Sequence, residues 1–244
     1  MKILKRILLG LLVVVAFTGI GFVVWAETPL GPAPEALAAL KSDSQVTVTI
    51  GDYITFAPTN IEPTTGFIFY PGGHVDYRSY AAPLHDLAAQ GYLVVLVPVR
   101  LNLAFFDVNA GQAAIEANPQ IEHWVVGGHS LGGVASALFA KDNPEIDGLM
   151  FWASYPADDS FKNSDIKVVS IYGTNDMAGM QKFEDTKALL PQDTQFVVID
   201  GGNHAQFGDY GPQPGDNPAT ISRAEQQKQV VEASANFLRS FGNP

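Results

Sequence analysis

The sequence of 244 residues contains no cysteine, so disulfide bonds, thiolate nucleophiles and cysteine-ligated metal sites are excluded. It also has few basic residues, with 14 Lys and Arg against 25 Asp and Glu. The part of the chain beyond residue 26 contains 11 of these basic residues and all 25 acidic ones, which gives it a formal net charge of −14. Such a charge argues against nucleic acid and anionic lipid head groups as partners.

Motifs that hold nucleotides or metals are missing as well. Neither G-x-x-x-x-G-K-[ST] nor G-x-G-x-x-G occurs, and the histidines lack the close spacing of metal ligands. We therefore expect neither a cofactor nor a metal. The chain also has no Asn-x-Ser/Thr acceptor for N-glycosylation. An exported protein without cysteine or acceptor sites is more typical of a bacterial envelope than of eukaryotic secretion.

The first 26 residues form a membrane-directed segment. Lys2, Lys5 and Arg6 give it a basic start, and residues 7–26 carry no charge. About 20 apolar residues in a helix cross a hydrocarbon core of about 30 Å, and they exceed the roughly 7–15 residues of a signal-peptide core. This length favours a retained anchor, although residues 24–26 also suit signal-peptidase cleavage. In both cases the positive-inside rule places the rest of the chain outside the cytoplasm.

The remainder divides into a short linker and one domain. Residues 27–44 are rich in proline and alanine and predict a spacer. Residues 45–244 have the length of a single globular domain. In this part, short apolar runs alternate with helical patterns, which predicts a mainly parallel sheet of about eight strands with helices on both faces. The expected strands are 46–50, 53–56, 66–70, 92–99, 122–126, 148–153, 167–172 and 195–199, and the expected helices are 80–90, 108–117, 130–141, 181–190 and 222–240.

The motif GHSLG at residues 128–132 stands between an expected strand and an expected helix. It fits G-x-S-x-G, in which a sharp turn exposes a serine oxygen and small flanking residues let strand and helix approach each other. A serine hydroxyl becomes a nucleophile only when a base removes its proton. Ser130 could equally cap a helix, so the choice depends on the rest of the chain.

The base and its orienting acid must follow Ser130 in this arrangement, in the order serine, acid, histidine. Of the five histidines only His204 lies downstream, in GGNHAQFG directly after an apolar strand. Asp176, at the end of KVVSIYGTND, is placed to accept the Nδ1–H of that histidine. Asp200 and the pair Asp158 and Asp159 are the competing acids.

The negative charge that develops in acyl transfer needs two hydrogen-bond donors. The backbone N–H of Leu131, which follows the serine, is expected to be one of them. The glycine-rich loop YPGGH at residues 70–74 should supply the second, from Gly73 or His74. His74 is interpreted as a backbone donor only, in preference to a substrate-facing side chain or an ordinary loop histidine. His129, although inside the motif, is interpreted as a neighbour of the site.

The segments GGHSLGG, IYGTND, GGNHAQFG and FYPGG together resemble the serine-hydrolase branch of the α/β-hydrolase superfamily, in particular compact members similar to carboxylesterases and dienelactone hydrolases. The resemblance covers about residues 46–241 and implies the α/β-hydrolase fold, with ester hydrolysis through an acyl-enzyme. A strict dienelactone hydrolase uses a cysteine, which this chain lacks. Only residues 154–164 follow the sixth expected strand before the approach to the next, so no cap domain is expected.

We therefore expect a serine hydrolase that cleaves carboxylic esters or related acyl bonds of a small-molecule or acyl-ester substrate. Ser130, His204 and Asp176 would be its nucleophile, base and orienting acid, and the apolar segment would place it at a membrane. Two alternatives remain open on the same fold: an acyltransferase that uses the same three residues, and a binding protein without catalytic activity. Trp152, Tyr172 and Phe207 are weak candidates for lining an acyl pocket.

Overall fold

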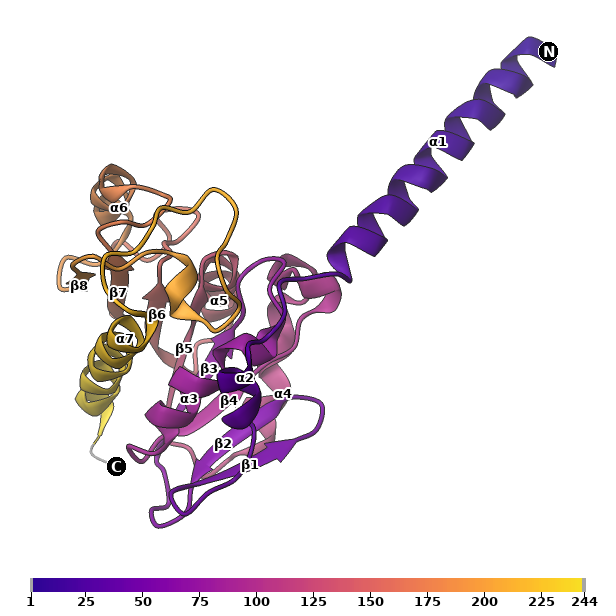
Figure 1. Ribbon diagram of the computed structural model, residues 1–244. Coiled ribbons are helices and arrows are strands. Elements are labelled where there is room, and N and C mark those ends of the chain that lie inside the picture. Colours follow the sequence, from indigo (N-terminus) through magenta and orange to yellow (C-terminus); the bar gives the residue numbers. More distant parts are fainter. Residues whose placement is uncertain (1, 243–244) are drawn as a thin grey trace.

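Eight strands form one sheet in the order β1-β2-β4-β3-β5-β6-β7-β8 in the computed structural model, which describes residues 2–242 (Figure 1). Neighbouring strands pair in parallel except at β2, which is antiparallel to both β1 and β4. The predicted sheet of about eight mainly parallel strands is confirmed. The strands are β1 Val46–Ile50, β2 Ile54–Pro58, β3 Thr65–Tyr70, β4 Leu93–Leu96, β5 His123–His129, β6 Ile146–Trp152, β7 Lys167–Gly173 and β8 Gln195–Ile199.

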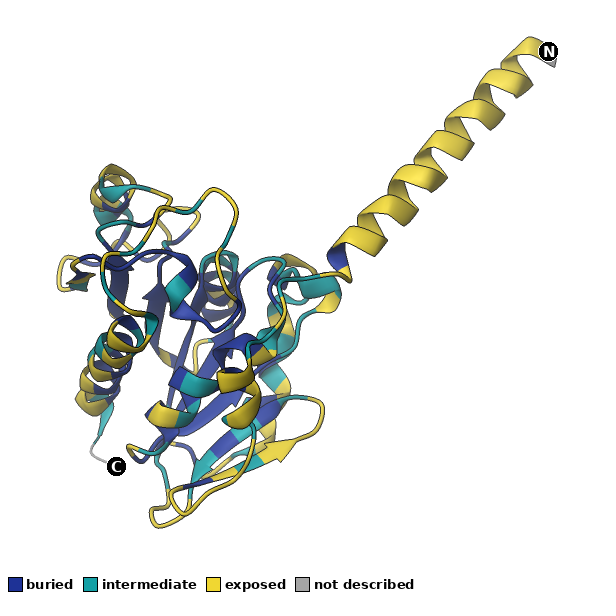
Figure 2. Ribbon diagram, in the orientation of Figure 1, coloured by how far each residue is buried: buried dark blue, intermediate teal, exposed yellow. Residues whose placement is uncertain are grey.

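Helices cover both faces of the sheet. One face packs on α3 and α7, and the other packs on α4 and α5 (Figures 1 and 2). The α-helices are α1 Lys2–Ala26, α2 Pro34–Ala38, α3 Ala81–Ala88, α4 Gln112–Ala117, α5 Leu131–Asp142, α6 Met180–Thr186 and α7 Arg223–Leu238. Short 3-10 turns precede α3 and α4 and follow α6 and α7, so those four helices are shorter than the sequence pattern predicts.

Successive residues of the central strands belong to different layers of the core. In β3, Phe67 and Phe69 pack with α3 and α7, whereas Ile68 and Tyr70 pack with α5. All six residues of this strand are buried. A strand buried on both faces is apolar along its whole length, which explains why its pattern in the sequence is a continuous run.

Two strand boundaries differ from the expectation by three residues, and the others differ by two or fewer. The strand predicted over residues 92–99 ends at Leu96, with one further bond from the Val97 N–H to the Phe69 carbonyl, and Pro98 has no N–H to continue the ladder. The strand predicted to end at Val126 continues to His129 because β3 and β6 pair with it on both sides. Gly127 lies so close to the Met150 carbonyl of β6 that a side chain would overlap it.

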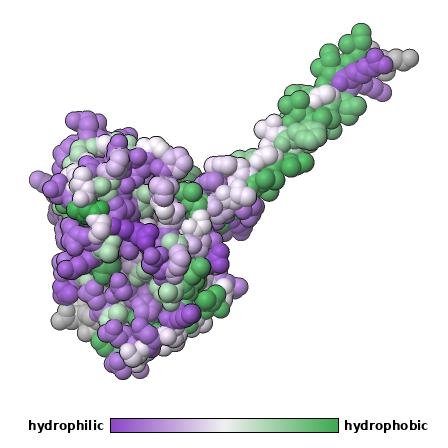
Figure 3. All heavy atoms as spheres, viewed as in Figure 1, coloured by the Kyte–Doolittle hydropathy of each residue, from purple (hydrophilic) through white to green (hydrophobic). Residues whose placement is uncertain are grey.

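The helix α1 projects from the domain as an exposed apolar rod (Figures 1, 2 and 3). Its residues 3–26 are long and apolar enough to cross a membrane, and they are exposed as far as Trp25, whereas Ala26 is buried. Residues 27–44, for which we expect a spacer, lie against the domain. Leu30 forms an isolated bridge with Val75, and the Ala33 N–H donates to the Asp209 carbonyl at 2.6 Å.

Candidate active site

Ser130 occupies a strained turn between β5 and α5. Its φ of 52° and ψ of −120° lie in a region that a residue with a side chain rarely adopts, at a cost of about 1–3 kcal/mol. The turn requires small neighbours, because a Cβ on Gly132 would overlap the Tyr70 carbonyl oxygen and one on Gly128 would lie 2.6 Å from the Gly132 carbonyl carbon. The side chain of Ser130 makes no capping hydrogen bond with α5.

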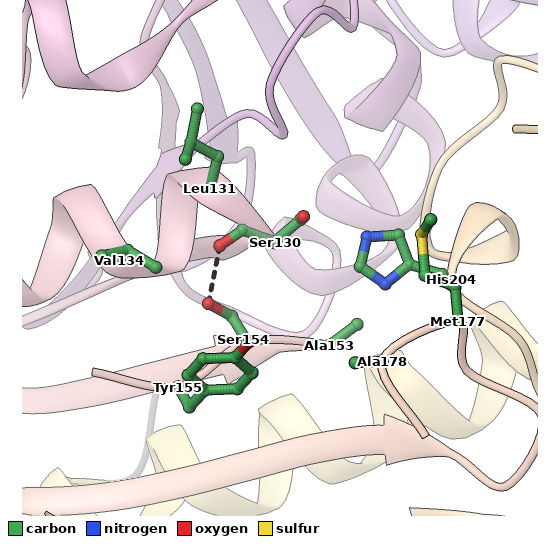
Figure 4. A pocket seen from close by; sticks show the side chains of 9 residues that line it. All are labelled: Ser130, Leu131, Val134, Ala153, Ser154, Tyr155, Met177, Ala178 and His204. Atoms are coloured by element: carbon green, nitrogen blue, oxygen red, sulfur yellow. Dashed lines mark hydrogen bonds between the residues drawn. The ribbon is translucent and has the colours of Figure 1, made fainter. Parts of the chain in front are cut away.

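The end of β6 holds this turn in place. The Ser130 N–H donates to the Trp152 carbonyl at 3.0 Å, and the Ser154 hydroxyl donates to the Ser130 carbonyl at 2.6 Å (Figure 4). Ala153, between these two partners, also has a positive φ of 47°. Hydrogen bonds from both sides of Ala153 thus join the two residues with positive φ, Ser130 and Ala153, and they hold the serine in its position at the turn.

His204 and Asp176 form a buried pair. His204 Nδ1 lies 2.9 Å from Asp176 Oδ2, and the two residues are 4% and 1% exposed. The other carboxylate oxygen, Oδ1, accepts the N–H of Ala178 at 2.8 Å. A carboxylate bonded to Nδ1 keeps the proton on that nitrogen, so Nε2 carries the free lone pair of the neutral ring and can act as a base.

The competing carboxylates lie elsewhere. Asp200 accepts a hydrogen bond from Thr174 at 3.3 Å on the surface. Asp158 accepts the backbone N–H of Ser160 and forms an exposed ion pair with Lys141 at 3.5 Å, and Asp159 is exposed too. Among the described residues, Asp176 is the carboxylate that contacts the His204 ring.

The Ser130 hydroxyl and the His204 ring face each other across a small cavity (Figure 4). Among residues 2–242 no hydrogen bond joins them, and catalytic contacts of this kind often tighten only when substrate binds. The cavity has a volume of about 270 Å³. Its lining residues are Ser130, Leu131, Val134, Ala153, Ser154, Tyr155, Met177, Ala178 and His204. Trp152, Tyr172 and Phe207, weak candidates for an acyl pocket, are fully buried away from it.

The loop after β3 lies beside the first turn of α5. A Cβ on Gly73 would come within 2.9 Å of Leu131 Cδ2, which places these two backbones next to each other. Within the described chain, the N–H of Gly73 has no acceptor. By contrast, the Gly72 N–H donates to the Tyr80 hydroxyl at 3.1 Å, and the His74 N–H donates to the Asn102 carbonyl at 2.8 Å. Of the two donors expected from this loop, His74 is therefore already engaged and Gly73 is free.

The side chain of His74 contacts the end of α1. Its ring stacks on Trp25 with centroids 4.2 Å apart, and its Nε2 donates to the Trp25 carbonyl at 2.7 Å. His74 has a φ of 57°, so its backbone is strained as well. Asn102, which accepts the His74 N–H, donates from its side chain to the Ala26 carbonyl at 3.0 Å. The glycine-rich loop is thus fastened to the last turn of α1, a contact that the sequence pattern did not predict.

His129 supports the site from behind. It is fully buried, and its Nδ1 lies 2.8 Å from the same Tyr80 hydroxyl that accepts the Gly72 N–H. Burial lowers the pKa of His129 well below its ordinary value, and the nearby His204 ring lowers it further, so the His129 ring is neutral. Its centroid lies 4.5 Å from that of His204. His129 therefore packs between the glycine-rich loop and His204 without facing the cavity.

Several residues of the site carry no motif. Asp216 accepts the N–H groups of His204 and Ala205 at 3.3 and 2.8 Å, which holds the histidine loop in place. It comes from an irregular segment in which no spacing marks it. Met177 lines the cavity because it directly follows Asp176, so its place could have been inferred from that neighbour.

Comparisons with known proteins identify the family. The sequence profile described as "Alpha/beta hydrolase family" matches residues 66–228, and no curated protein matches the chain. The esterase domain of a Rhodothermus marinus protein is similar in structure, with a TM-score of 0.62, 14% identity, and coverage of 80% of this chain and 98% of that one.

Two further structures are similar in the same way. A protein described as a predicted CIB-like hydrolase of Thermoplasma acidophilum has a TM-score of 0.57 at 12% identity, with 80% of this chain and 99% of that one covered. TT1662 of Thermus thermophilus has a TM-score of 0.56 at 12% identity, with 79% and 98% covered. At such identities the likeness concerns the fold, whereas the profile match spans more than half of the sequence. The chain belongs to the alpha/beta hydrolase family.

Proposed function

We propose that this hydrolase cleaves carboxylic esters through an acyl-enzyme formed on Ser130. The observation that carries the proposal is the strained serine that faces a histidine whose Nδ1 is bonded to a buried aspartate. His204 is the base and then the acid, and Asp176 orients it. The N–H groups of Leu131 and Gly73 donate hydrogen bonds to the carbonyl oxygen as it becomes negatively charged.

The steps of the reaction follow from these positions. Ser130 Oγ attacks the ester carbonyl while His204 Nε2 takes its proton, and the carbonyl oxygen becomes an oxyanion near the two N–H groups. The C–O bond to the alcohol then breaks, and His204 returns the proton to the leaving oxygen. Water attacks the acyl-enzyme by the same route, which releases the acid and restores Ser130.

The cavity beside Ser130 favours a short acyl group. Its volume of about 270 Å³ lies just below the roughly 300–1,000 Å³ of sites that enclose drug-sized ligands. Leu131, Val134 and Tyr155 give it apolar walls, which suit a few methylene groups. Among the described residues, no helix lies between β6 and β7 to cover the site. The alcohol part of the ester is therefore free to extend outside the protein.

We place the enzyme outside the cytoplasm, with α1 retained as an anchor. The helix has a basic start and an uncharged stretch that is long enough to span a membrane. Ala26 is fully buried, and the Trp25 and Ala26 carbonyls accept hydrogen bonds from the domain. A cleavage after Ala26 would remove these contacts with the glycine-rich loop.

The nucleophile is tested with a fluorophosphonate probe on the full chain in detergent micelles. The wild type should be labelled and Ser130→Ala should not. Ser164→Ala is the matched control, since it removes a hydroxyl that also donates to a backbone carbonyl but lies away from the cavity. Equal labelling of wild type and Ser130→Ala would refute the assignment.

The acid is tested by turnover of a short p-nitrophenyl ester. Asp176→Asn should lower kcat by about 10⁴-fold, as expected when a histidine is held in the wrong tautomer. Asp200→Asn and Asp158→Asn remove exposed carboxylates and should leave kcat within about twofold. A large loss in either of these controls, with Asp176→Asn active, would refute the role of Asp176.

A further inference from the structure

Four partly exposed aromatic side chains lie where α1 meets the domain; we call them the aromatic patch. Phe22 and Trp25 belong to the last turns of α1, and Phe105 and Phe106 belong to the loop 100–107. The Phe22 and Phe106 rings meet edge to face with centroids 6.2 Å apart. Phe105 and Phe106 are 48% and 52% exposed, although residues 101–106 are otherwise held against the domain.

The position of α1 places the aromatic patch at membrane depth. If residues 7–26 cross the hydrocarbon core of about 30 Å, Trp25 lies at its outer boundary, where tryptophan is favoured. Phe22 precedes Trp25 by three residues, which is about 4.5 Å deeper along the helix axis. Phe106 contacts Phe22, so the tip of the loop 100–107 reaches the same level. The domain would then sit directly on the bilayer surface.

The charge of the loop fits this location. Residues 101–106, LNLAFF, contain no ionisable side chain. The two charged residues that flank them, Arg100 and Asp107, form an ion pair at 3.5 Å, so the loop adds no net charge. The domain as a whole carries a formal −14 and would be repelled by anionic lipid. This loop without net charge is therefore suited to enter a bilayer although the domain surface as a whole is acidic.

The same loop lies next to the glycine-rich loop beside the cavity. A Cβ on Gly73 would come within 3.6 Å of Leu103 Cδ2 of the loop 100–107 and within 2.9 Å of Leu131 Cδ2, which lines the cavity. Asn102 accepts the His74 N–H and donates to the Ala26 carbonyl. A short series of contacts thus joins the aromatic patch to the glycine-rich loop and the cavity.

We propose that the aromatic patch inserts into the lipid bilayer at the end of α1, so that the cavity opens at the lipid–water interface and takes its ester from an amphiphile held there. The substrate class is an ester with a short acyl group on a membrane-bound alcohol, and the lipid has neutral or zwitterionic head groups. The substrate part of this inference rests on the proposed esterase activity. The insertion of the aromatic patch does not.

The absence of cysteine gives a direct test of insertion, because each introduced cysteine is the single one in the chain. Full-length Phe106→Cys and Phe105→Cys carry a nitroxide label in phosphatidylcholine vesicles. Ile61→Cys is the matched control: Ile61 is 43% exposed and apolar, but it lies in the loop between β2 and the amino end of β3, whereas the glycine-rich loop follows the carboxyl end of β3. The labels at 105 and 106 should collide more with oxygen than with a water-soluble nickel complex, and the label at 61 should do the reverse.

A label at 106 as accessible to the nickel complex as the label at 61 would overturn the proposal. Labelling of Ser130 by the fluorophosphonate probe is independent of this result, so the failure of insertion and the failure of the esterase assignment are distinguishable.

The substrate class is tested with the double variant Phe105→Ser, Phe106→Ser. Its hydrolysis of a short-chain acyl ester embedded in phosphatidylcholine vesicles should fall by roughly tenfold or more, because the domain no longer buries the two phenylalanine rings in the bilayer when it binds the membrane surface. Its hydrolysis of a water-soluble short ester should stay within about twofold. An equal loss on both esters would show damage to the site and would refute a role at the interface.

Discussion

The hydrogen bond from Ser154 to the turn at Ser130 allows a quantitative prediction. The Ser154 hydroxyl donates to the Ser130 carbonyl at 2.6 Å, and Ser154 is 2% exposed. The same carbonyl also accepts the N–H groups of Gly133 and Val134 at 3.1 and 3.4 Å. Ser154→Ala therefore leaves no orphaned acceptor, and the cost is that of one ordinary bond, about 0.5–1.5 kcal/mol.

This free energy is measurable as a change in Tm. A domain of about 200 residues loses about 2–4 °C per kcal/mol, so Ser154→Ala should lower Tm by about 1–6 °C. Because the bond restrains the strained backbone of Ser130, kcat for a short p-nitrophenyl ester should fall by roughly ten- to a hundredfold, as for a small displacement of a reacting group. Thermal unfolding is followed by near-ultraviolet circular dichroism on the full chain in micelles.

Ser164→Ala is the matched control for this prediction. The Ser164 hydroxyl also donates to a backbone carbonyl, that of Phe161 at 2.8 Å, but it lies in a partly exposed turn away from the cavity. It should change kcat by less than about twofold. A Ser154→Ala variant with wild-type kcat would refute the view that β6 restrains the serine turn, and a loss above about 3 kcal/mol would show that the site depends on more than this bond.

Three further predictions concern the glycine motif, the contact with α1 and pH. Gly132→Ala should prevent folding or lower Tm by more than 10 °C (roughly 3 kcal/mol or more), because its Cβ would overlap the Tyr70 carbonyl. The control is Gly211→Ala, whose Cβ would meet no atom within 4 Å; its φ of 81° should cost only about 1–2 kcal/mol. Thermal unfolding followed by circular dichroism compares the two variants. His74→Ala, which removes the stack on Trp25, should lower kcat by roughly tenfold in steady-state kinetics with KM nearly unchanged, and a wild-type kcat would contradict this. Burial lowers the pKa of His129, so below about pH 6.5 the unfolded chain binds a proton that the folded chain does not. The free energy of unfolding should therefore decrease as the pH is lowered below about 6.5, by up to about 1.4 kcal/mol per pH unit. Urea titrations at several pH values measure this slope, which His129→Asn should lack.

The sequence predicted the sheet well because burial leaves a local record. The runs at residues 46–50 and 195–199 were predicted at the bounds that the structure shows for β1 and β8. Glycine was less informative, since Gly127 and Gly128 read as the start of a turn but belong to β5. Their place in the strand follows from pairing with Phe69 and Tyr70 on one side and Met150 and Phe151 on the other. Such pairing is a property of the assembled sheet and is absent from any single segment.

For the candidate site, the order of residues along the chain pointed to Ser130 and His204 and made Asp176 the preferred one of several carboxylates. A parallel sheet brings the carboxyl ends of its strands to one edge, so residues directly after those strands meet even when far apart in sequence. The same rule does not apply to segments without a strand pattern. Asp216, Asn102 and the last turn of α1 reach the site through irregular loops, whose course depends on packing.

The sequence by itself determined the alternation of strands and helices, the absence of thiol chemistry, the apolar helix with its basic start, and the residues that a strand-end site can use. Only the tertiary structure decided which carboxylate meets His204, that within residues 2–242 the His74 N–H has an acceptor and the Gly73 N–H has none, and that α1 contacts the glycine-rich loop. The physical reason is range. Hydrophobic periodicity and turn chemistry act between near neighbours and are visible in the chain, whereas a hydrogen-bond partner 49 residues away, as for His74 and Trp25, exists only after folding.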